Sequence, residues 1–67
     1  MGRTEARIFL AEIGATTDEV DKLFEEVDER QGWTVFTPIG DKDTSVCLAR
    51  IPGAHGSRTQ NYQVTVR

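Results

Sequence analysis

The periodicity of residues 17–31 constrains the fold of this chain most strongly, because it predicts an amphipathic helix. Apolar side chains recur there at the spacing of one helix face: Val20, Leu23, Phe24 and Val27. Thr16 and Glu19 have the spacing of an N-terminal capping box, and Gly32 stands where a left-handed C-terminal cap belongs. We therefore expect a helix over about 17–31, with the apolar stripe in the core.

Beyond this helix the pattern becomes typical of strands and turns. The β-branched and aromatic residues at 33–37 predict a strand, 38–44 has turn chemistry, and 45–51 predicts the returning strand of a hairpin. Residues 52–60 are rich in Pro, Gly, Ser and Thr, which is typical of a loop. Apolar and polar side chains alternate over 61–67, which predicts a half-buried strand at a sheet edge or between subunits.

The segment 4–13 has two interpretations. As a helix, its apolar face contains Ala6, Phe9, Leu10 and Ile13, but Ile8 is left exposed. As a strand, the short apolar run around Ile8 is buried on both sides, and the chain begins with a strand–helix–strand unit. We favour the strand.

The helical alternative resembles a helix-turn-helix, with a turn glycine at Gly14 between two apolar elements. The second helix of that motif would be strongly acidic, and affinity for duplex DNA depends mainly on neutralising phosphates. Two core-packing elements joined by a turn are therefore the preferred interpretation of this segment.

These elements define an α+β fold, with one amphipathic helix packed on an antiparallel sheet of three to four strands. The 67 residues are expected to form a single small domain, 1–67, with a thin core. One cysteine and one histidine provide neither a disulfide nor a zinc site, so self-association as a homodimer is the expected source of extra stability. No apolar run has the length of a membrane span, and no signal peptide is visible. The unpaired Cys47 fits a reducing compartment, so we predict a cytoplasmic protein without a membrane partner.

Charge is unevenly distributed along the chain. The net charge of −3 combines −5 over residues 1–31 (4 basic minus 9 acidic) with +2 over residues 32–67 (4 basic minus 2 acidic). On the helix, Asp21, Glu25 and Asp28 lie along one flank of the apolar stripe, and no basic residue is expected on that flank. Such a flank can be a solvated surface or a docking strip for a basic partner.

The aromatic strand is a second candidate surface. Trp33 and Phe36 are expected to point to opposite faces of the 33–37 strand, so that one lies in the core. The other would cover a second subunit or anchor a partner.

The basic half suggests an alternative, the binding of an anion or a nucleic acid. Its candidate residues are Arg50, His55, Ser57, Arg58 and Arg67, together with the 52–60 loop. The loop lacks the Gly-Lys-Ser/Thr pattern of a phosphate-binding loop, so an ordinary connection between strands is the preferred interpretation of this segment.

No paired acid and base points to an enzyme. Cys47 and His55 could form a nucleophilic pair, but no third group orients them, and a structural cysteine is the commoner case. The sequence therefore predicts a non-enzymatic interaction or regulatory module without a cofactor. It would bind a macromolecular partner, expected to be a protein, through the acidic helix or the aromatic strand.

Overall fold

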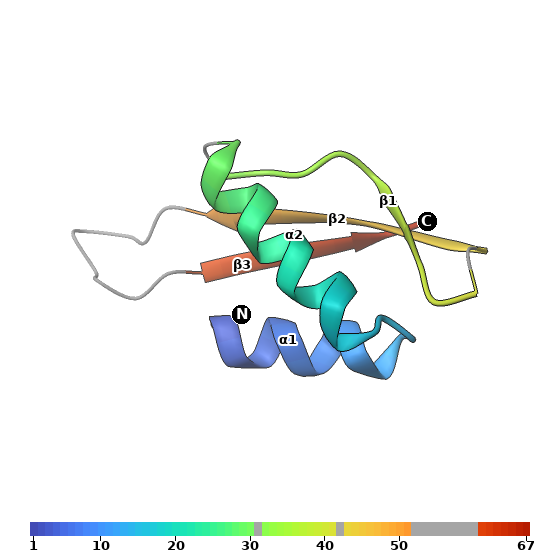
Figure 1. The fold of residues 1–67 in the computed structure, drawn as a ribbon. Helices are drawn as coiled ribbons and strands as arrows, with labels where there is room; N and C mark the ends of the chain where they lie inside the picture. The colour runs from blue at the N-terminus through green and yellow to red at the C-terminus, as the bar shows by residue number, and fades with distance from the viewer. Residues whose placement is uncertain (31, 42, 52–60) are drawn as a thin grey trace.

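The chain forms two helices packed on a three-stranded antiparallel sheet, an α+β fold, in a computed structural model (Figure 1). The structure describes residues 1–30, 32–41, 43–51 and 61–67. The helices are α1 (Arg3–Glu12) and α2 (Thr17–Glu29), and the strands are β1 (Thr37–Ile39), β2 (Thr44–Ile51) and β3 (Asn61–Val66). The sheet order β1-β2-β3 places the longest strand in the centre and makes β3 an edge strand, as the alternation of 61–67 predicted.

Helix α2 confirms the predicted helix in position and in orientation. The Thr16 hydroxyl accepts from the Glu19 amide at 3.2 Å, and the Glu19 carboxylate accepts from the Thr16 amide at 2.9 Å, so the capping box is present. The helix ends at Glu29, two residues before the predicted limit, and its C-cap is Arg30. Gly32 therefore lies two residues beyond the cap, with a positive φ of +113°. All four residues of the predicted apolar stripe are buried: Val20, Leu23, Phe24 and Val27.

The preferred strand interpretation of residues 4–13 is wrong, because this segment is helix α1. Ala6 and Leu10 are completely buried in the core cluster, and Ile13 packs against it. Ile8 is 55% exposed, which was the objection to a helix. A single exposed apolar side chain is common on protein surfaces and costs less than losing the buried face.

Both helices cover the same face of the sheet. The core joins Ala6 and Leu10 of α1 to Val46 and Leu48 of β2 and to Tyr62 of β3. The Tyr62 and Phe24 rings meet edge to face with centroids 5.0 Å apart, and Figure 1 shows α2 crossing the sheet in front of β2 and β3. The described core side chains of the sheet all lie on this face: Ile39, Val46, Leu48 and Tyr62.

The predicted strand at 33–37 is wrong in its position, because regular pairing begins only at Thr37. Trp33 forms an isolated bridge with Ala49, and Thr37 pairs with Val46. Residue 37 lies four positions after 33, whereas 46 lies only three positions before 49. The segment 33–37 therefore contains one residue more than the part of β2 that it faces, which is a bulge. The turn predicted at 38–44 is shorter for the same reason, since β1 extends to Ile39.

Thr34 explains the interruption in pairing. Its backbone amide donates to the Leu48 carbonyl at 2.9 Å, but the Leu48 amide donates to the Thr34 hydroxyl, also at 2.9 Å, instead of to a backbone carbonyl. Thr34 is 1% exposed, so its hydroxyl is needed to satisfy a buried amide.

Replacing this hydroxyl should destabilise the fold. Thr34→Val keeps the shape of the side chain but leaves the buried Leu48 amide without an acceptor, which costs about 1–3 kcal/mol. Thr34→Ser is the matched control, because it loses a methyl group but keeps the acceptor. Urea denaturation should show a larger loss of stability for Thr34→Val than for Thr34→Ser, and the reverse order would contradict this role for the hydroxyl.

Candidate functional site

The extra residue between Trp33 and Thr37 brings two aromatic side chains to the same face of the sheet. Directly paired residues in an antiparallel sheet share a face, so Trp33 lies with Ala49 on the face away from the helices. Thr37 lies with buried Val46 on the helix side, which places Phe36 on the same face as Trp33. The expectation that these two side chains point to opposite faces, with one in the core, is therefore wrong.

Each of these aromatic rings is stacked against an arginine. The Arg30 guanidinium lies 4.8 Å from the centroid of the Trp33 ring, and the Arg67 guanidinium lies 3.9 Å from the centroid of Phe36. Trp33 is 52% exposed, whereas Phe36 is partly covered. Stacked arginines are held in place by the rings while their N–H groups stay available to a ligand.

Small side chains separate the two aromatic–arginine pairs. Residue pairing between β2 and β3 sets Cys47 opposite Thr65 and Ala49 opposite Gln63 on this face. The Cys47 thiol donates to the Thr34 carbonyl at 3.0 Å, so it has a structural partner. We call this surface the open sheet face and define it by Trp33, Phe36, Cys47, Ala49, Gln63, Thr65, Arg30 and Arg67.

The acidic flank of α2 is more neutral in the structure than in the sequence. Arg7 of α1 lies 2.6 Å from the Asp21 carboxylate, and Arg50 of β2 lies 3.3 Å from the Asp28 carboxylate. The inference that these carboxylates lack a basic neighbour is therefore wrong for Asp21 and Asp28. Glu25 is exposed, and the described part of the chain gives it no ion pair.

Two of the basic candidates also have partners in the structure, and the others lie outside the described residues. Arg50 is engaged by Asp28, and Arg67 lies on Phe36. His55, Ser57 and Arg58, with the whole 52–60 loop, lie outside the described residues. In the described ranges no three His, Cys, Asp or Glu side chains are grouped to hold a metal ion.

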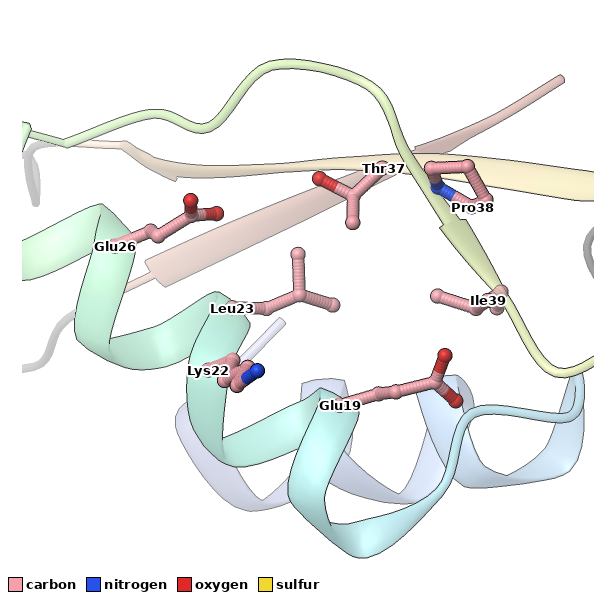
Figure 2. Close-up of a pocket in the computed structure, with 7 residues that line it drawn as sticks. All are labelled: Glu19, Lys22, Leu23, Glu26, Thr37, Pro38 and Ile39. Carbon is pink, nitrogen blue, oxygen red and sulfur yellow. The ribbon is translucent and has the colours of Figure 1, made fainter.

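A small groove lies between α2 and β1, and no sequence pattern predicted it. It has a volume of about 280 Å³. Figure 2 shows Leu23 and Ile39 facing each other across it, with Glu19 and Glu26 at its ends. The Glu19 carboxylate also accepts from the Gly40 amide at 3.2 Å in addition to capping α2. Glu19 therefore connects α2 to the end of β1, which is a structural role.

Comparisons with known proteins identify no relative of this chain. A scan against protein-family models, a search of curated proteins and a search of solved structures each returned no match to this chain. Neither described helix has the length and apolar character needed to cross a membrane.

Proposed function

We propose that this chain is a non-enzymatic interaction module that binds a protein partner through the open sheet face. The observation that carries the proposal is the pair of aromatic rings on one face, each stacked against an arginine. Tryptophan and arginine are enriched among the residues that contribute most to protein–protein affinity. Aromatic side chains in this position supply large contact areas while losing little conformational entropy.

The chemistry of this face also indicates the kind of partner. Arg30 and Arg67 carry positive charge on a surface whose other defining side chains are neutral or apolar. A partner segment that combines acidic and apolar side chains would complement it, with carboxylates on the guanidinium groups and apolar groups against Trp33. This module would act in the reducing environment of the cytoplasm, which the unpaired Cys47 suits.

The acidic helix is the less favoured surface for this function. Ion pairs with Arg7 and Arg50 occupy two of its three candidate carboxylates, so Glu25 alone remains of the proposed strip. Arg50 is likewise less available to a phosphate because Asp28 already neutralises it. These contacts favour the open sheet face over both other candidates.

Selection from a peptide-display library on the immobilised protein tests the proposal. We expect the selected peptides to combine Asp or Glu with apolar residues. Trp33→Ala should weaken their binding by about 30-fold or more, the effect of losing a residue central to an interface. Glu25→Lys is the matched control at an exposed site on α2, and it should leave the affinity within about twofold.

Two results would reject this assignment. Peptides that bind Trp33→Ala as well as the parent but lose affinity for Glu25→Lys would assign binding to the acidic helix. Submicromolar binding of labelled DNA or RNA at low salt, abolished by Arg50→Glu, would establish the alternative of nucleic-acid binding.

A further inference from the structure

The outer edge of β3 carries backbone groups that no described part of the chain pairs. Arg67 exchanges backbone hydrogen bonds with Ser45, at 2.9 and 3.4 Å, so every second residue from there points its amide and carbonyl toward β2. The amides and carbonyls of Tyr62, Val64 and Val66 therefore point outward. Among the described residues, only those of Tyr62 have backbone partners, both on Met1: its amide donates to the Met1 carbonyl, and its carbonyl accepts from the Met1 amino group.

The two edges of the sheet differ in their protection against pairing with another strand. Strand β1 has three residues and includes Pro38, and both brevity and proline are common ways to block a sheet edge. Strand β3 ends in Val64-Thr65-Val66, which are β-branched residues without charge or proline. Val66 is also 44% exposed. This edge is therefore suited to accept a strand.

We infer that the chain forms a two-fold dimer in which β3 pairs antiparallel with β3 of a second copy. Met1 already forms hydrogen bonds with the outward backbone amide and carbonyl of Tyr62. A second strand can therefore pair only with the backbone amides and carbonyls of Val64 and Val66. Pairing Val64 with Val66 of the second copy uses every outward amide and carbonyl of these residues in both chains. The two-fold axis then passes beside Thr65, which lies opposite Thr65 of the second copy.

The side chains are compatible with this register on both faces. On the helix side, Val64 lies opposite a second Val66, so the exposed valines become covered. On the open sheet face, Thr65 meets Thr65, and Gln63 lies opposite Arg67 rather than a like charge. Among the β3 residues that face each other in this register, no like charges are paired.

Helix α1 contributes apolar surface near the same edge. Arg7 points toward α2, where it contacts Asp21. Phe9, only partly covered, therefore lies on the opposite flank of α1, away from α2, because two residues turn the helix by more than half a revolution. The flank that carries Phe9 would approach the valines of the second copy. The dimer keeps all four helices on one side and joins the two open sheet faces into one continuous surface, whatever partner that surface binds.

Sedimentation equilibrium at hundreds of micromolar should give a mass twice the 7.5 kDa of the chain. Val66→Pro removes an outward amide without removing a bond to β2, so it should give a folded monomer. Val66→Thr keeps that amide and the β-branched shape, and it should remain dimeric.

Disulfide trapping tests the register separately. In a Cys47→Ser background, Thr65→Cys should form a disulfide between copies, because facing residues of this kind have Cα atoms about 4.5 Å apart, within the range of a disulfide. Gln63→Cys lies on the same face, but its two copies would be about 13 Å apart, so it should not crosslink. A folded monomer of the parent chain, or equal crosslinking at both positions, would overturn the inference.

Discussion

Phe24→Ala is expected to remove about a third or more of the free energy of unfolding. Phe24 is 2% exposed and contacts the Tyr62 ring, and the Arg3 guanidinium lies 4.6 Å from its centroid. Removing a buried phenylalanine costs about 3–5 kcal/mol. At typical stabilities per residue, a chain of this length has about 3–10 kcal/mol in total, so at the lower end of this range the variant would be unfolded.

Circular dichroism during thermal or urea denaturation measures this loss. The control is Ile8→Ala on α1, because Ile8 is 55% exposed and its truncation should change stability by no more than about 0.5 kcal/mol. If Phe24→Ala melts with the parent, the packing of α2 on the sheet is incorrect.

Gly40→Ala should also be strongly destabilising, for a reason that lies in the backbone. Gly40 has a φ of +60°, and a Cβ there would lie 2.7 Å from the carbonyl oxygen of Gly14. The positive φ and the forced displacement of backbone together should cost roughly 2–4 kcal/mol. The change would separate the turn after β1 from the connection between the helices.

Gly14→Ala separates the two causes. Gly14 also has a positive φ, +106°, but an added Cβ would meet no atom of the described residues within 4 Å. Gly14→Ala should therefore lose stability through backbone strain alone, at a φ further from the left-handed region than that of Gly40. A loss of no more than about 1 kcal/mol for Gly40→Ala in urea denaturation, the cost of the left-handed backbone alone, would mean that its close approach to Gly14 contributes nothing.

The helix at 17–29 could be predicted from the sequence because its signals are local. The apolar stripe repeats within the helix, and the capping box needs only Thr16 and Glu19. The α+β fold followed from the change of period after Gly32. The wrong strand at 4–13 arose because a short apolar run fits both periods, and only the burial of Ala6 and Leu10 in a core shared with distant elements decides between them.

The arrangement of the candidate site depends on contacts that local patterns do not contain. The Thr34 hydroxyl replaces a backbone acceptor and inserts one residue into the pairing, which brings Trp33 and Phe36 to one face. The partners of Asp21 and Asp28 come from other elements, 14 and 22 residues away. Sequence reasoning identified Trp33 and Phe36 as candidates but could not place them together. It assigned Arg67 to the basic half, and it missed the stacking of Arg30 and Arg67 on the rings.

The fluorescence of Trp33 reports directly on whether a partner binds the open sheet face. Trp33 is the only tryptophan in the chain and is 52% exposed, so its emission in the free protein should be red-shifted and readily quenched by acrylamide. Adding a selected acidic and apolar peptide should shift the emission to the blue and protect it from the quencher, in proportion to the fraction bound. If the peptide binds to saturation but leaves the emission and the quenching of Trp33 unchanged, the partner does not bind the open sheet face.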